Sequence, residues 1–328
     1  MAKKSNTPLI SIVLPVYNAA EYLAETLDSI VRQTFRDYEL LAVNDGSTDG
    51  SQDILEAYAK RDDRIVVIQQ KNKGLVTTLN ETIAKAKGAY IARADADDPS
   101  FEDRLALQSS ILQKNEDIVL VGGGFEIIDE SGFFIETVCG LTRDEDIRRA
   151  MLVRNPFGHA GVMFRKSAFE KAGGYSGTCG PTEDFDLWIR ISMQGELASI
   201  ARPAYRYRIV SSGISQTKSA EQAHYTKKLT DAQWKAAFPS TLSRRTLQKR
   251  SEECLQSSPR LSYAIGLKEQ FLTDNARIGM KLIRYGKPVK GIIQLISICS
   301  TGRSGVRIVI RQLRNLDAGS FKQLTKRS

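Results

Sequence analysis

The chain has 328 residues and a formal net charge of +9 at pH 7, from 47 Lys and Arg against 38 Asp and Glu. No apolar stretch approaches the roughly 20 residues that a membrane-spanning helix needs, so we do not expect the protein to cross a bilayer. Two histidines and four widely separated cysteines argue against a zinc cluster and a disulfide framework, and unpaired cysteines favour a reducing cytoplasm.

The N-terminal part of the chain alternates between strand-like and helix-like segments. Apolar runs of strand length lie at residues 9–16, 38–43, 65–69 and 90–94. The first run contains Pro15 and lacks a small-residue cleavage site, so we predict a buried strand there and not a signal peptide. Helical stretches lie between the runs: the first spans residues 21–32, the second is capped by Ser47 or Thr48 and runs towards Lys60, and the third ends at Gly88.

This alternation predicts an α/β fold with a doubly wound, mostly parallel sheet and helices on both faces. Ligands in such sheets bind at the carboxyl ends of the strands. Three polar motifs follow strands at that edge, at residues 15–18, 44–49 and 95–98. Simple turn chemistry could explain each motif alone, but it would have to act three times at the same edge.

The motif Asp95-Ala96-Asp97-Asp98 crowds three carboxylates at the end of one strand. Carboxylates this close raise one another's pKa unless a metal or a basic group neutralises them. A hard divalent ion such as Mg²⁺ or Mn²⁺, which takes oxygen ligands and is shared with substrate phosphates, fits this pattern. The alternative is a solvated Asp-rich turn closed by Pro99.

These motifs resemble, in order along the chain, those of the family 2 glycosyltransferases of GT-A fold. The resemblance covers roughly the first two thirds of the chain. It rests on residues 15–18, 44–49, 72–74 and 95–98, on Arg104-Leu105, on Gly173-Gly174-Tyr175, and on Glu183-Asp184 leading into residues 186–190. It implies a Rossmann-like nucleotide-binding half joined to an acceptor-binding half.

The resemblance places the nucleotide sugar against the first motifs. It implies that Pro15, Tyr17 and Asn18 line the nucleobase pocket and that Lys73 lies on the donor side. It also implies that Asp45 accepts hydrogen bonds from the base, which suits a carboxylate facing the imide N–H of uracil. The alternative role for Asp45 is to stabilise a turn.

By the same resemblance, Asp97 is the direct ligand of Mn²⁺ or Mg²⁺ and Asp95 lies near the ribose and the metal. Asp98 is left open, since a turn role before Pro99 would suffice. Arg208 is a candidate phosphate clamp.

The second acidic site is Glu183-Asp184 at the start of a helix. Carboxylates stabilise a helix N-terminus, so capping is one explanation. The resemblance implies that Asp184 is the general base for the acceptor hydroxyl, with Glu183 orienting it or capping the helix. It also implies that His159 and Trp188 lie on the acceptor side, although a structural role for His159 is equally compatible with the sequence.

Together these assignments predict an inverting, metal-dependent sugar transferase that uses a nucleotide diphosphate donor, expected to be a UDP-sugar. A sugar-1-phosphate nucleotidylyltransferase is the rival enzyme, but it needs a Gly-rich loop where the chain has Tyr17-Asn18-Ala19-Ala20. A degenerate membrane scaffold is the rival without activity, and the intact acids argue against it. The absence of a P-loop and of a dinucleotide fingerprint excludes the kinase and dehydrogenase classes.

The C-terminal part is strongly basic, with 25 Lys and Arg against 7 Asp and Glu in residues 200–328. We predict a catalytic domain over residues 1–215 and a helical basic region over 216–328. Amphipathic stretches at 291–299 and 306–316 suit either helices lying on an anionic membrane or a helical bundle with a solvated basic face. No nucleic-acid motif is present. We therefore expect a cytoplasmic protein that is peripheral on the inner membrane face and acts on a saccharide or lipid-linked saccharide, while its oligomeric state stays open.

Overall fold

The structure is a computed structural model that describes residues 7–210, 213 and 217–237. The predicted basic helices at 291–299 and 306–316, and most of the predicted C-terminal region, lie outside the described residues. Chain contacts separate two compact units. The larger unit consists of residues up to Gly132, Thr137–Arg148 and Asn155–Arg208, and every candidate site residue belongs to it. The predicted domain boundary at residue 215 stays a prediction.

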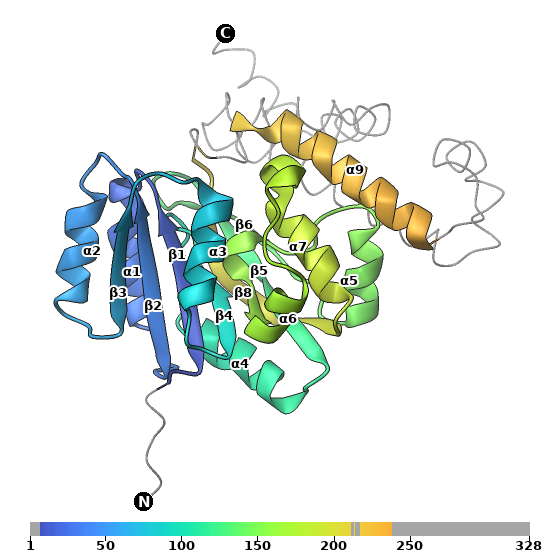
Figure 1. The fold of residues 1–328 in the computed structure, drawn as a ribbon, viewed down its shortest axis with the longest axis horizontal. Helices are drawn as coiled ribbons and strands as arrows, with labels where there is room; N and C mark the ends of the chain where they lie inside the picture. The colour runs from blue at the N-terminus through green and yellow to red at the C-terminus, as the bar shows by residue number, and fades with distance from the viewer. Residues whose placement is uncertain (1–6, 211–212, 214–216, 238–328) are drawn as a thin grey trace, which may run out of the picture. The chain divides into compact units, whose positions relative to one another are not determined.

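The first half of the larger unit contains four strands, each followed by a helix, as the sequence pattern predicts. The strands are β1 (Ile10–Val16), β2 (Tyr38–Asp45), β3 (Ile65–Gln70) and β4 (Tyr90–Arg93). The helices are α1 (Ala20–Val31), α2 (Ser51–Ala59), α3 (Leu75–Lys85) and α4 (Arg104–Lys114). Figure 1 shows this succession in blue to green.

The chain between residues 118 and 208 is less regular. It contains β5 (Ile118–Ile128), β6 (Phe134–Val138), α5 (Asp144–Met151), the 3₁₀ helix η1 (His159–Gly161), β7 (Met163–Arg165) and α6 (Lys166–Lys171). It continues with the 3₁₀ helix η2 (Gly177–Thr182), α7 (Glu183–Ser192) and β8 (Glu196–Arg208). The second compact unit contains α9 (Ser219–Ala237), in which Lys227 pairs with Asp231 one turn away.

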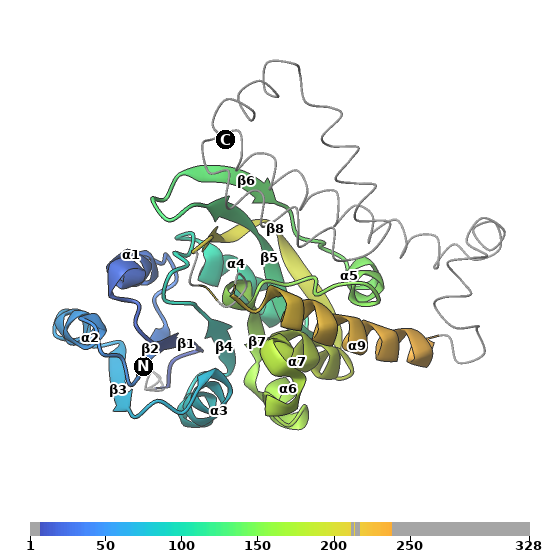
Figure 2. The ribbon, with the colours of Figure 1, turned by 90° about the horizontal axis from the view of Figure 1, so that it is seen from above.

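The strands form one sheet in the order β3-β2-β1-β4-β7-β5-β6, with β8 paired to β5. Strands β1 to β4 are parallel, and β7 runs antiparallel to β4 and β5. Figure 2 shows α1 and α3 on opposite sides of the first strands. The mostly parallel, doubly wound sheet is therefore confirmed.

Burial explains why the first strands read as continuous apolar runs. A parallel sheet covered by helices on both faces buries side chains of both orientations. All eight residues of β2 are buried, and β1 is buried except for Pro15. Apolar residues of β1, α1 and β2 form the centre of the core, among them Ile12, Leu14, Leu23, Leu27 and Leu40.

One local prediction is wrong: neither Ser47 nor Thr48 caps α2. The helix begins at Ser51, and its N-cap residue is Gly50, which makes no side-chain capping bond. Ser47 and Thr48 instead bond Asn18 in the loop after β1. A contact between two loops thus replaces the predicted local cap.

The described residues contain no helix that is both long and apolar enough to span a membrane.

Candidate active site

The loops after β1 and β2 are tied to each other. Asn18 has a left-handed backbone with φ of 48°. Its backbone N–H donates to Ser47 Oγ at 3.0 Å, and its Oδ1 accepts from the backbone N–H of Thr48 at 2.9 Å. Tyr17 is 56% exposed, so much of its side chain is accessible to a ligand. Pro15 is the penultimate residue of β1, opposite Val43 of β2.

Asp45 lies buried at the end of β2 and organises the loop at residues 72–74. Its Oδ1 accepts from Gln70 Nε2 at 2.8 Å and from the backbone N–H of Lys73 at 2.9 Å. Its Oδ2 accepts from the backbone N–H of Gly74 at 3.0 Å. The turn-stabilising role is therefore present, and a carboxylate with about four acceptor positions can still receive one more donor. Contact with a nucleobase stays a prediction.

Lys73 presents its ammonium group outside this loop. Its Nζ pairs with Glu81 of α3 at 2.7 Å, and both side chains are exposed. Water competes for such a pair, so it holds Lys73 only weakly.

Arginines supply part of the positive charge that the acidic loop at residues 95–98 requires. Arg93 is only 1% exposed, and its guanidinium pairs with Asp95 Oδ1 at 2.5 Å. Asp98 is buried, and its Oδ1 accepts the backbone N–H of Arg208 at 2.9 Å. Burial, together with the charges of Asp97 and Asp95, raises the pKa of Asp98 well above its usual range. The sequence analysis missed Arg93, although a charged residue inside an apolar strand was a visible signal.

Asp97 differs from its two neighbours. In the part of the chain that the structure describes, no hydrogen bond or ion pair joins its carboxylate to another side chain. Burial raises the pKa of Asp97 to about 6, and the negative charge of Asp95 adds to the shift. A half-buried carboxylate without an ion pair suits a metal ligand, because a bound cation would remove the cost of its charge.

The protein offers few further metal ligands. Within residues 7–210, 213 and 217–237, no group of three or more His, Cys, Asp and Glu side chains is arranged to hold a metal ion. Mg²⁺ commonly binds through one or two carboxylates together with substrate phosphates and water. Asp97, with Asp95 beside it, fits this kind of shared site and does not fit an all-protein cage.

Arg208, the predicted phosphate clamp, is occupied by protein groups. Its guanidinium is buried, where it donates to the carbonyl oxygens of Asp97 at 3.2 Å and Glu130 at 3.1 Å. It also pairs with Glu25 of α1 at 2.5 Å and lies over the ring of Tyr22, 4.6 Å from the ring centre. In this structure Arg208 braces the acidic loop through these contacts, and its role as a phosphate clamp stays a prediction.

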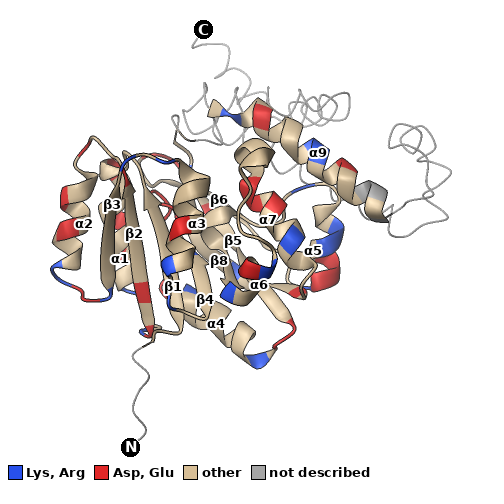
Figure 3. Ribbon diagram, in the orientation of Figure 1, with Lys and Arg blue, Asp and Glu red and all other residues tan. Residues whose placement is uncertain are grey.

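The second acidic motif opens α7. Asp184 Oδ1 accepts the backbone N–H of Phe185 at 2.7 Å, and Oδ2 accepts Asn155 Nδ2 at 2.8 Å. Burial raises the pKa of Asp184 to about 7, and the neighbouring charge of Glu183 contributes. Such a carboxylate can exchange a proton near neutral pH, as a general base must. Figure 3 shows the acidic residues in the first turn of α7, where they also stabilise the helix dipole.

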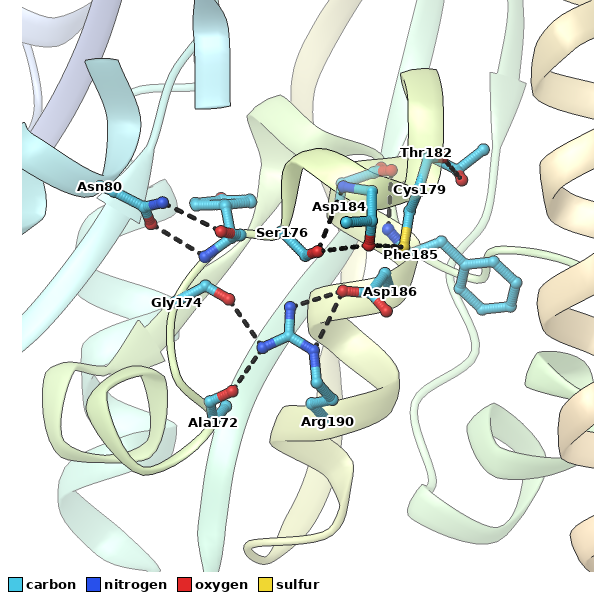
Figure 4. Close-up of polar contacts among 12 residues, drawn as sticks. Asn80, Ala172, Gly174, Ser176, Cys179, Thr182, Asp184, Phe185, Asp186 and Arg190 are labelled. Atoms are coloured by element: carbon cyan, nitrogen blue, oxygen red, sulfur yellow. Dashed lines mark hydrogen bonds and ion pairs between the residues drawn. The ribbon is translucent and has the colours of Figure 1, made fainter. Parts of the chain in front are cut away.

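A set of polar contacts fixes the segment before α7. Arg190 pairs with Asp186 one turn earlier and also donates to the carbonyl oxygens of Ala172 and Gly174, as Figure 4 shows. Asn80 of α3 makes two hydrogen bonds to the backbone of Tyr175, which follows Gly174. Its Nδ2 donates to the carbonyl oxygen of Tyr175, and its Oδ1 accepts the backbone N–H of Tyr175, each at 2.9 Å. These contacts give α7, and with it Asp184, a fixed position within the larger unit.

His159 connects the arginine beside the first acidic motif to the segment that precedes the second. Its Nε2 lies 2.8 Å from Tyr175 Oη and 3.3 Å from Nε of Arg93, which in turn pairs with Asp95. Burial and the charge of Arg93 lower the pKa of His159 well below its usual range, so the ring is neutral. Because arginine can only donate, Nε2 of His159 accepts and the ring proton lies on Nδ1.

Trp188 is a core residue in this structure, and its place on the acceptor side stays a prediction. The side chain is 0% exposed and packs edge-on against His159 at 5.9 Å between ring centres. Leu187 and Ile191 of the same helix are also fully buried. Trp188 thus contributes to the packing around His159 and has no exposed surface in this structure.

Alternating strands and helices with polar loops at the strand ends, followed by a half that carries an acidic helix, are consistent with the GT-A fold of glycosyltransferases. The chain belongs to glycosyl transferase family 2, whose family model matches residues 11–173. The predicted family and fold are both confirmed.

Two relatives illustrate the similarity. The chain is 37% identical over 192 residues to EpsE of Bacillus subtilis, which bears the name of a glycosyltransferase, and the match covers 57% of this chain and 68% of EpsE. It is 33% identical over 184 residues to the O-antigen biosynthesis glycosyltransferase WbnJ of Escherichia coli, which covers 56% of this chain and 71% of WbnJ.

Two solved structures share the fold. The mannosyltransferase PcManGT of Pyrobaculum calidifontis, in complex with GDP-Man and Mn²⁺, has a TM-score of 0.57 and 15% identity over 98% of this chain and 84% of its own. Residues 1–349 of Staphylococcus aureus TarS, in complex with UDP-GlcNAc, have a TM-score of 0.51 and 14% identity over 89% of this chain and 91% of that one.

Proposed function

We propose that this family 2 glycosyltransferase moves a sugar from a nucleotide diphosphate donor to a saccharide or lipid-linked saccharide in surface polysaccharide biosynthesis, with inversion at the anomeric carbon. One observation carries the proposal. A continuous set of contacts, Asp95 to Arg93 to His159 to Tyr175, links the acidic loop after β4 to the segment that leads into α7. These contacts support the proposal that the candidate metal ligand and the candidate base serve the same site.

Each carboxylate has a role that its surroundings favour. Asp184 accepts the proton of an acceptor hydroxyl, whose oxygen attacks the anomeric carbon while the bond to the diphosphate breaks. A single displacement of this kind inverts the configuration at that carbon. Asp97, with Asp95, would hold Mn²⁺ or Mg²⁺, which when bound supplies positive charge beside the departing diphosphate. Tyr17 offers a ring for the base to stack on.

The relatives support the class of substrate. The structure of PcManGT contains GDP-Man and Mn²⁺, that of TarS contains UDP-GlcNAc, and WbnJ is named for O-antigen biosynthesis. We propose a UDP-sugar as the donor because the carboxylate of Asp45, at the end of β2, suits the imide N–H of uracil. The chain belongs to a glycosyltransferase family, and no observation favours the alternative of a sugar-1-phosphate nucleotidylyltransferase.

We also propose that the basic region from residue 216 onwards brings the enzyme to an anionic membrane surface on the cytoplasmic side, where a lipid-linked acceptor would lie. The proposal rests on the excess of Lys and Arg in residues 200–328.

A panel of nucleotide sugars tests the proposed donor. Slow donor hydrolysis, in which water replaces the acceptor, should appear with one UDP-sugar in the presence of Mn²⁺ and should stop when the ion is chelated. If a GDP-sugar is hydrolysed and no UDP-sugar is, the donor is a GDP-sugar and the proposed UDP-sugar is wrong. If no member of the panel is hydrolysed or bound, the proposed function fails.

A further inference from the structure

Asp184 is held by an asparagine from a distant loop. Asn155 Nδ2 donates to Asp184 Oδ2 at 2.8 Å, across 29 positions of the sequence. No sequence motif indicated Asn155. In this segment, His159 was the residue that we predicted to belong to the site. The contact therefore adds a residue to the site that neither the sequence pattern nor the family resemblance provides.

The orientation of this amide is fixed from both ends. Asn155 Oδ1 accepts the backbone N–H of Phe157 at 3.2 Å, so the remaining Nδ2 must face the carboxylate. Pro156 follows directly and restricts the backbone of Asn155 to extended conformations. The ring of Phe157 is buried against Gly122 of β5, where an added Cβ would lie only 2.2 Å from it. The loop therefore rests on the sheet and cannot easily turn the amide away.

The type of donor matters for a base. An Arg or Lys at this place would stabilise the ionised carboxylate strongly and lower its pKa, which would weaken the base. A neutral amide fixes the geometry at a smaller cost in basicity. Each oxygen of Asp184 then receives one donor, from Phe185 and from Asn155, and each retains an acceptor position for a substrate hydroxyl.

We propose that Asn155 is the positioning residue for the general base: it aims Asp184 at the acceptor hydroxyl and sets the carboxylate's readiness to take a proton. This proposal rests on the proposed function for its catalytic meaning, whereas the coupling between the two side chains can be measured without any substrate.

Three titratable groups lie around Asp184 among the described residues: Glu183, Tyr175 and His159. Glu183, on the same helix, is the charged neighbour that raises the pKa of Asp184. Tyr175, on the preceding segment, is neutral because burial raises its pKa far above the usual value. His159, beside Tyr175, is neutral because burial lowers its pKa.

The direct test is to titrate Asp184 and to observe the titration by NMR, with protein labelled with ¹³C at the aspartate carboxyl carbons. The signal is assigned by its loss in Asp184→Asn. Asn155→Ser can keep the turn to Phe157 through its hydroxyl but cannot reach Asp184, and Asn155→Asp introduces a like charge. We expect the titration midpoint of Asp184 to rise to higher pH in both variants, and by about one pH unit or more in Asn155→Asp.

Asn115 provides a matched control. Its Oδ1 accepts the backbone N–H of Asp117 at 3.0 Å, which is the same local turn without a contact to Asp184. Asn115→Ser and Asn115→Asp should leave the Asp184 midpoint unchanged. Thermal unfolding and binding of UDP show whether each variant is folded.

Kinetics then separate the two claims. With the donor that the panel selects, the acidic limb of the kcat profile should move to higher pH in the Asn155 variants, with little change in KM. Folded Asn155 variants with an unshifted midpoint would overturn the positioning role. If instead Asp184→Asn keeps full activity, the proposed base fails, and the NMR result still reports whether Asn155 and Asp184 are coupled.

Discussion

Replacing Asp184 with Asn tests the proposed chemistry most sharply, because it keeps the shape of the side chain and removes its ability to take a proton. General acid–base catalysis contributes about 10² to 10⁴ in rate, so turnover should fall by at least about 10². Binding of the donor should be preserved, since the described contacts of Asp184 are to Phe185 and Asn155 and not to the donor loops.

The pH dependence of the wild-type enzyme follows from the same residue. A base acts only when it has lost its proton, so activity should rise with pH through the pKa of Asp184, about 7. A group with that pKa is ionised to about one tenth at pH 6 and about nine tenths at pH 8. We therefore expect a roughly tenfold increase in kcat between these values, and the profile should lose this limb in Asp184→Asn.

The assay is donor hydrolysis at saturating nucleotide sugar, with Glu183→Gln as the matched variant. Glu183 raises the pKa of Asp184, so its neutralisation should move the limb to lower pH while turnover persists. The reasoning is refuted if Asp184→Asn turns over at the wild-type rate. An inactive Glu183→Gln beside an active Asp184→Asn would assign the base to Glu183.

Four further predictions concern the metal, the core and the basic region. Asp97→Ala should abolish the Mn²⁺-dependent part of UDP binding in calorimetry while unfolding stays cooperative; equal metal dependence in mutant and wild type would remove Asp97 from the site. Arg208→Leu leaves buried carbonyl groups without their donor, so the free energy of unfolding in urea should fall by about 1 to 3 kcal/mol; a phosphate clamp alone would weaken binding and leave stability unchanged. Trp188→Ala should cost about 3 to 5 kcal/mol by the same measurement, and a stable variant with altered acceptor KM would support its acceptor-side role. Removing residues 286–328 should weaken co-sedimentation with anionic vesicles. Salt should release the full-length chain from the vesicles, because salt screens the electrostatic attraction. Full-length protein that does not bind such vesicles at low salt would contradict the membrane proposal.

The sequence predicted the first half of the fold well because its signals are local. The ends of β1, β3 and β4 lie within one residue of the ends of the predicted apolar runs, because parallel strands that are buried on both faces consist almost entirely of apolar residues. The same local reasoning failed at Ser47 and Thr48. Their side chain and backbone bond Asn18, 29 and 30 positions away, and no local pattern contains that information.

The candidate site shows the same limit more strongly. The acidic positions were visible as motifs, but Asn155 and Arg208 were not visible as their partners, because they reach them only in the folded chain. Arg93, by contrast, lies two residues before Asp95 and could have been recognised as a charged residue in an apolar strand. The three acids after β4 therefore have different surroundings: Asp95 faces Arg93, Asp98 faces the backbone of Arg208, and Asp97 has no such partner.

The central claim is that Asp184 activates the acceptor for one inverting displacement. The configuration of the sugar first released from an α-linked nucleotide sugar, followed by proton NMR before the ring equilibrates, tests it most directly. The account predicts that the β-anomer appears first, and that its formation is lost in Asp184→Asn. Initial release of the α-anomer would contradict a single displacement, and undiminished release in Asp184→Asn would contradict the role of the base.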